Sequence, residues 1–186
     1  MNQEISAAEV VAFWRDAGAT KWFTKDEAFD AEIRRRFEDL HHVAARAELS
    51  DWAASAEGAL ALLILIDQFP RNMFRGSAHA FATDALALSI ARKAVDAGFD
   101  QRTETALRFF FYLPFEHSER IEDQERSVAL CAAYQAAGGG KDIHDYAIVH
   151  RDIIVRFGRF PHRNAVFGRE TTPAEQAFLD EGGFAG

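Results

Sequence analysis

Three short segments combine a proline with charged side chains that could bind an anion or transfer a proton. In each segment the proline follows a large apolar residue at a predicted helix end, and polar residues come shortly after it. The segments are Phe69-Pro70-Arg71-Asn72, Leu113-Pro114-Phe115-Glu116-His117 and Phe160-Pro161-His162-Arg163-Asn164. Helix ends expose carbonyls that a following Arg or Asn can satisfy. The segments are therefore either structural corners or convergent walls of one polar pocket.

Arginine would supply the anion-binding part of such a pocket, because its planar guanidinium contacts a carboxylate or phosphate at two points. Asp67 lies four residues before Arg71, where a helical ion pair would form, and this pair would leave Arg75 and Arg163 as the better ligand contacts. The complete set of candidate ligand-binding residues is Arg71, Asn72, Arg75, His150, Arg159, Arg163 and Asn164.

Acid–base chemistry would fall to carboxylates and imidazoles near the same corners. Histidine titrates near neutrality and is the usual proton-transfer group. The candidate catalytic residues are His117, Glu116, Glu119 and His162, with His150 as a further imidazole. The alternative for each histidine is a hydrogen-bonded role in helix packing. We expect His41, His42 and His79 to be exposed.

Several other chemistries have no sequence support. The paired Glu-x-x-His pattern of helical dimetal sites, the His-Glu-x-x-His motif, the glycine-rich phosphate loop and the Gly-x-Ser-x-Gly elbow are all missing from the sequence. We therefore predict neither a metal nor a cofactor. The one cysteine, Cys131, lies in an apolar run, which indicates a small buried side chain and a reducing compartment.

The charge balance argues against nucleic acid as a partner. The formal net charge is −8, whereas a nucleic-acid binder needs a concentrated basic surface. The longest apolar run, from Ala59 to Ile66, is far shorter than the roughly 20 residues of a membrane span. The amino terminus lacks the features of a signal peptide. We expect a cytoplasmic protein with no membrane partner.

The elements that must position these residues are predicted to be helices. Apolar residues recur at helical spacing, and capping boxes begin at Ser6, Thr24 and Thr172. Further helices are expected to begin after Ser77 and Ser118, and Pro70 is expected to end the helix before it. The pattern predicts a single all-α domain over residues 1–186, with seven to eight helices and no sheet.

The motifs at the corners also resemble a known family. The chain is similar to bacterial domain-of-unknown-function family 924 over nearly its whole length. The resemblance implies an all-helical fold grouped with tetratricopeptide-like superhelices, built as an array of antiparallel helical hairpins. It implies no activity and no catalytic residues. The motifs that carry it are residues 65–76, 80–84, 112–119 and 156–164.

Two functions remain open. The favoured one is a ligand-binding or protein-interaction module whose Arg/His/Glu pocket accepts an anionic group, from a small ligand or a peptide or protein partner. The alternative is an enzyme of the hydrolase or lyase type that uses His/Glu acid–base chemistry in the same pocket. The 17 phenylalanines predict an aromatic core, in which we expect Leu62, Ile66, Phe69, Phe81, Phe109 and Ile154 to be buried.

Overall fold

The computed structural model describes residues 5–184, and 73% of the protein is helical with no strand in the described part. The all-α prediction is confirmed. The chain divides into two compact units, of which the first holds the residues up to Arg75 and His79–Pro114, and the second holds Gly76–Ala78 and the residues from Phe115 onward. The single domain expected over residues 1–186 stays a prediction.

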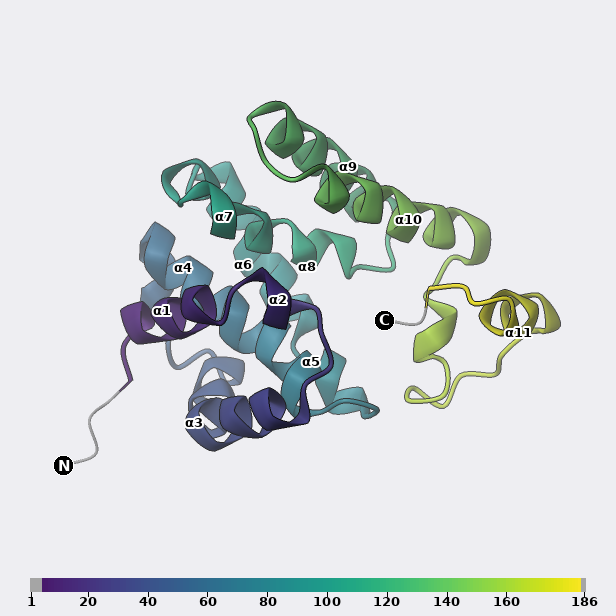
Figure 1. Cartoon of the computed structure of the whole chain (residues 1–186), viewed down its shortest axis with the longest axis horizontal. Coiled ribbons are helices and arrows are strands. Elements are labelled where there is room, and N and C mark those ends of the chain that lie inside the picture. Colours follow the sequence, from purple (N-terminus) through teal and green to yellow (C-terminus); the bar gives the residue numbers. More distant parts are fainter. Residues whose placement is uncertain (1–4, 185–186) are drawn as a thin grey trace. The chain divides into compact units, whose positions relative to one another are not determined.

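The first unit consists of α-helices of 4 to 19 residues joined by short 3-10 segments (Figure 1). Its α-helices are α1 (Ala7–Ala17), α2 (Ala19–Trp22), α3 (Glu27–Ala45), α4 (Ala56–Leu63), α5 (Phe69–Met73), α6 (Asp84–Asp96) and α7 (Thr105–Arg108). The 3-10 segments are η1 (Ser50–Ala54), η3 (Ala78–Phe81, of which Ala78 belongs to the second unit), η4 (Asp100–Arg102) and η5 (Phe109–Phe111). Helix α8 (Leu113–Glu116) carries the chain from the first unit into the second.

Aromatic rings form the centre of the first unit. The Phe69 ring lies 5.6 Å from that of Trp14 and 4.9 Å from that of Phe37, and all three side chains are fully buried. Tilted and edge-to-face contacts of this kind add to the burial of apolar area. Of the six residues expected in the core, five are buried and Phe81 is only partly buried. Phe81 instead lies beneath the guanidinium of Arg71, at 5.5 Å, on the short η3 turn.

The helix before Pro70 does not end there, contrary to the prediction. A π-helical stretch, η2 (Ile64–Gln68), precedes α5, and the amide of Phe69 donates to the carbonyl of Ile64. A proline cannot donate to the preceding turn and its ring crowds the carbonyl there, so a wider turn lets the chain continue. The released carbonyl of Ile66 accepts a hydrogen bond from the Thr83 hydroxyl.

A histidine satisfies the neighbouring carbonyl of the same π-helical stretch. His41 Nδ1 lies 2.9 Å from the Leu65 oxygen, and its side chain is buried, so the expectation of an exposed His41 was wrong. Because a carbonyl only accepts, Nδ1 carries the proton. Burial lowers the pKa of His41, and the hydrogen bond to Leu65 opposes that shift.

The second unit is built on a helical hairpin. Helices α9 (Ile121–Ala136) and α10 (Lys141–Phe157) pack along each other across a short loop (Figure 1). Gly158, at φ 69°, closes α10 in the left-handed conformation, after which come η6 (Pro161–Arg163) and α11 (Pro173–Asp180). Ile153, Ile154 and Phe160 form a small core, with Phe157, Phe178 and Phe184 packed against it. A tetratricopeptide-like array of such hairpins stays a prediction.

The helix starts were predicted with mixed success. The capping boxes at Ser6 and Thr172 are present, whereas Asp26 rather than Thr24 caps α3. The helix expected after Ser77 begins only at Asp84, because the η3 turn comes first. Ser118 does not cap α9, which begins after Arg120.

Candidate functional site

The second unit brings together polar residues from three separate segments. Glu116 and His117 come at the end of α8, His150 lies in α10, and His162 and Arg163 lie in the η6 turn that follows Phe160. The electrostatic influence of His117, His162 and Arg163 reaches the His150 ring. These five residues, here called the His/Arg cluster, were all named as candidates from the sequence.

A buried contact between Glu116 and His150 fixes one imidazole of the cluster. His150 Nδ1 lies 2.8 Å from the Tyr146 carbonyl and 3.2 Å from Glu116 Oε1. Both oxygens accept, so the proton of a neutral imidazole is on Nδ1 and the lone pair is on Nε2. Glu116 and His150 are 4% and 6% exposed, so the pair is removed from bulk solvent.

His150 is neutral at physiological pH. Burial is the main cause that lowers its pKa to about 3, and the electrostatic effects of His117, Arg163 and His162 act in the same direction. The hydrogen bond to Tyr146 opposes the shift. The imidazole therefore offers a hydrogen-bond acceptor at Nε2, whereas its low pKa makes it a weak general base near pH 7.

Arg163 is held by backbone and ring contacts. Its Nη1 donates to the His117 carbonyl at 2.9 Å, and its guanidinium lies 4.4 Å from the centre of the Phe160 ring. The side chain is 6% exposed. Gln124, also buried, supports the same corner, because its amide donates at 2.6 Å to the carbonyls of both Glu116 and Ser118. Gln124 carries no sequence signal that would have singled it out.

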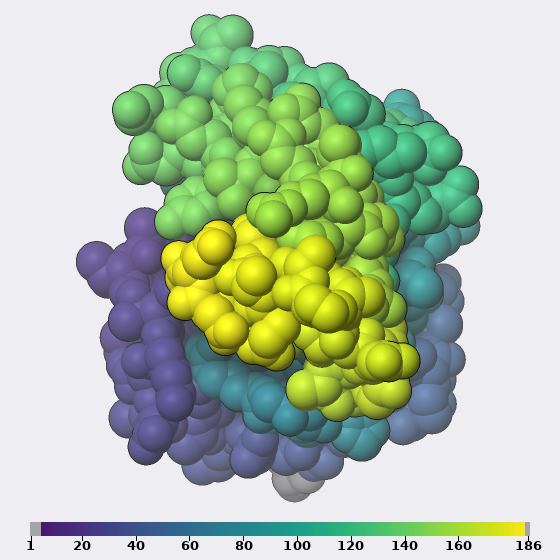
Figure 2. Space-filling view, turned by 90° about the vertical axis from the view of Figure 1, so that its right-hand side faces the viewer, coloured from purple at the N-terminus to yellow at the C-terminus, as the bar shows by residue number. Residues whose placement is uncertain are grey.

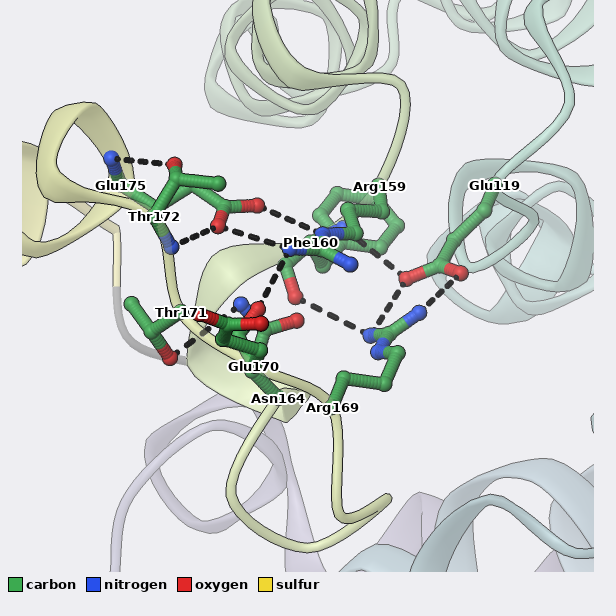
Figure 3. A network of polar contacts seen from close by, with 9 residues as sticks. All are labelled: Glu119, Arg159, Phe160, Asn164, Arg169, Glu170, Thr171, Thr172 and Glu175. Carbon is green, nitrogen blue, oxygen red and sulfur yellow. Dashed lines mark hydrogen bonds and ion pairs between the residues drawn. The ribbon is translucent and has the colours of Figure 1, made fainter.

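Glu119, a predicted acid–base residue, belongs to an ion-pair network with Arg169 (Figure 3). Its carboxylate accepts from Arg169 at 2.7 and 3.0 Å and from the Phe160 amide at 2.9 Å. Burial opposes its ionisation, but these hydrogen bonds together with the charges of Arg169 and Arg163 hold its pKa below the usual range. Glu119 thus fixes the start of the η6 turn, and Arg169 is a partner that the sequence prediction missed.

Arg159 and Asn164, predicted to bind a ligand, have structural partners in the same region (Figure 3). Arg159 forms a two-point contact with the buried Glu175 at 2.6 and 2.8 Å. This contact is the first cause that lowers the pKa of Glu175 to about 2, with the Thr172 cap assisting. Asn164 is fully buried, and its amide lies 3.4 Å from the Thr171 hydroxyl.

The predicted ligand-binding residues of the first unit also have acidic partners. Arg71 contacts Asp84 at 3.0 and 3.1 Å and lies 3.5 Å from Asp67, so the expected Asp67–Arg71 pair is confirmed. Its Nη1 also donates to the Asp67 carbonyl at 2.6 Å, as expected of an arginine at a helix end. Arg71 belongs to a different unit from the His/Arg cluster.

Asp30 is the hydrogen-bond partner of Asn72 and Arg75, the other two candidate residues that follow Pro70. It accepts from the Asn72 amide at 2.7 Å and from Arg75 at 2.5 and 3.1 Å. Arg75 is therefore less available to a ligand than its position in the sequence indicated. That these residues share one pocket with Glu116, His117, His162 and Arg163 stays a prediction.

Two open hollows lie in the first unit. One, of about 440 Å³, is lined by residues of α1, α2 and α3 that include Phe13, Phe29 and Arg36. The other, of about 270 Å³, lies beside the Arg15–Glu104 ion pair. Neither is lined by a residue predicted for the site.

Residues 5–184 contain no group of three or more His, Cys, Asp or Glu side chains arranged to hold a metal ion. Over the same residues, no helix is both long enough and apolar enough to cross a membrane. Cys131 is fully buried, and burial raises the pKa of its thiol to about 12, so the thiol is protonated at neutral pH.

Comparisons with known proteins give a family and a close structural relative. Residues 10–183 match the model of a family described as bacterial protein of unknown function (DUF924). The chain is 51% identical to a protein of unknown function from Agrobacterium tumefaciens whose structure is solved. The match has a TM-score of 0.88 and covers 94% of this chain and 97% of that one. None of the curated proteins matches.

Proposed function

The chain belongs to the bacterial DUF924 family of unknown function, and we propose that it is a binding module that takes a small anionic ligand at the His/Arg cluster of its second unit. The proposal places Arg163 and His162 in direct contact with the anion. His117 adds positive potential when protonated, and the lone pair of His150 accepts a hydrogen bond from the ligand.

One observation carries the proposal, namely that Arg163, His117 and His162 all act electrostatically on the His150 ring. Arg163 and His162 lie in the turn that follows α10, and His117 lies at the end of α8, and all three disfavour a further proton on His150. The Coulomb repulsion that these groups exert on a proton at His150 would attract an anion, whereas burial, the largest cause of the low pKa, and the nearby Glu116 carboxylate oppose one.

The enzyme alternative has weaker support in the geometry. General acid–base catalysis is most efficient when the catalytic pKa lies near the working pH. His150, the imidazole that a carboxylate orients, has a pKa of about 3. Glu119 is held by Arg169 and the Phe160 amide. A hydrolase or lyase mechanism would therefore rest on His117 or His162, with Glu116 as the nearby carboxylate.

The test is calorimetric titration of the full-length protein with two probes, inorganic phosphate and succinate. We expect both to bind the wild type, and R163Q and H162Q each to weaken binding by about ten- to a hundredfold, as expected for loss of a charge-assisted hydrogen bond. R163K, which keeps the charge but loses the planar fork, should bind with intermediate affinity.

The matched control is R151Q. Arg151 lies in α10 of the same unit and pairs with Asp152 at the surface. We expect R151Q to bind both probes as the wild type does. If R151Q weakens the binding of the probes as much as R163Q does, the effect comes from net charge rather than from a site, which would count against the proposal. Absence of binding to the folded wild type would refute it.

A further inference from the structure

An aromatic side chain near the carboxyl end of the chain closes over two histidines of the His/Arg cluster. The Phe184 ring lies 4.4 Å from that of His150 and 5.4 Å from that of His162, both in edge-to-face geometry. Phe160 contacts the same two imidazoles, each at 5.6 Å. The four rings thus form a closed set of contacts, of which Phe184 is the member that follows the last helix.

Two glycines direct Phe184 to this place. Gly182 takes φ 79°, a conformation that favours glycine, and its amide donates to the Leu179 carbonyl. At Gly183 a Cβ would lie 2.5 Å from the backbone oxygen of Phe178, so no other residue fits without a shift. The chain therefore turns sharply after α11. Figure 2 shows the yellow carboxyl-terminal part of the second unit at the surface, against light-green residues of the same unit.

The Phe184 ring has apolar neighbours on one side and polar neighbours on the other. The ring packs against the small core of Ile153, Ile154 and Phe160. Its remaining neighbours are His150 and His162, and Arg163 lies over Phe160. An apolar slot beside an anion-binding group is the arrangement that recognises a ligand with a ring at one end and a carboxylate at the other.

We propose that Phe184 occupies the apolar half of the anion site and that the ligand is an aryl carboxylate whose ring displaces it. This inference rests on the proposed function, to which it adds the ligand class. The ring of the ligand replaces Phe184 on the core of Ile153, Ile154 and Phe160, and its carboxylate reaches Arg163 and His162. Phe184 then acts as an internal competitor that lowers the apparent affinity of the wild type.

The test compares 3-phenylpropionate with succinate as calorimetric probes of the full-length wild type and F184A. Removing the competitor should tighten the binding of 3-phenylpropionate at least tenfold in F184A. Binding of succinate, which has no ring, should change by less than about threefold. F184L, which keeps an apolar side chain but not the ring, should give a smaller gain and guards against a fold effect specific to alanine.

The matched control is F167A, which removes a partly exposed ring of the same unit that lies beside Arg169. We expect F167A to bind both probes as the wild type does. An unchanged affinity of F184A for 3-phenylpropionate, or a weaker one, would overturn the inference, and succinate binding that still depends on Arg163 would leave the proposed function standing. If neither probe binds folded wild type or F184A, the proposed function fails and this inference fails with it.

Discussion

Replacing His150 by asparagine should make the protein less sensitive to acid. The amide nitrogen of asparagine takes the approximate place of Nδ1, so H150N can keep the hydrogen bond to the Tyr146 carbonyl. Asparagine cannot take up a proton. The variant therefore removes the titrating group while keeping most of the packing around it. It should fold at pH 7 with some loss of stability.

The size of the effect follows from the pKa of His150. In the unfolded chain a histidine has a pKa of about 6.5, whereas in the folded protein burial and nearby cations lower the pKa of His150 to about 3. Between these values the unfolded state binds the additional proton. The contribution of His150 to the free energy of unfolding is therefore fully present above the unfolded pKa of the residue, and it is lost as the pH falls toward 3. At about 1.4 kcal/mol per pKa unit, going from pH 7.5 to 4.5 should cost the wild type about 2 to 3 kcal/mol through this residue.

The assay is urea unfolding followed by circular dichroism at several pH values. The free energy of unfolding of the wild type should fall more steeply with decreasing pH than that of H150N, by the amount given above. The matched control is H144N. His144 lies in α10, as His150 does, and its imidazole contacts Gln135 of α9 at the surface. Identical pH profiles for the wild type and H150N would refute the claim that His150 is buried in its neutral form.

Three further predictions concern the frame that holds the site. Phe69→Ala should lower the free energy of unfolding by about 3 to 5 kcal/mol, because the ring is fully buried, and an unchanged urea midpoint would contradict this. Thr83→Val keeps the shape of the side chain but leaves the Ile66 carbonyl without its hydroxyl donor, and urea unfolding should show a loss of about 1 to 3 kcal/mol, with no loss counting against the role given to Thr83. Glu175, whose pKa is about 2, contributes stability above the unfolded pKa of about 4.3 that is lost as the pH falls toward 2. Thermal unfolding of E175Q should therefore depend less on pH in this range than that of the wild type, and an equally steep dependence would contradict the Arg159–Glu175 pairing.

The parts of the fold that could be predicted from sequence are those decided by nearby residues. In the capping boxes at Ser6 and Thr172, both hydrogen-bonding partners lie within four positions of each other. The same local pattern failed at Thr24 because the carboxylate of Asp26, two residues later, accepts from two amides of the first turn. His41 could have been recognised as buried, since it continues at spacing four the apolar stripe of Phe29, Ile33 and Phe37.

The ion pairs could not be predicted, because an arginine is chemically compatible with any carboxylate. Arg75 pairs with Asp30, 45 positions away, and Arg169 pairs with Glu119, 50 positions away. Only the packing of the helices decides which acid each arginine meets. The proline corners did indicate where Glu116, His117 and Arg163 lie, because a helix end followed by surplus charge requires partners for its exposed carbonyls and its buried charges.

The most direct test of anion binding at the His/Arg cluster is nuclear magnetic resonance of the histidine rings in protein labelled with ¹⁵N-histidine. Inorganic phosphate is the probe, at constant pH and ionic strength. The account predicts saturable shifts for the ring nitrogens of His117, His150 and His162, and none for His41, His42, His79 and His144. Shifts confined to the histidines outside the cluster, or no saturable shift in any ring, would contradict it.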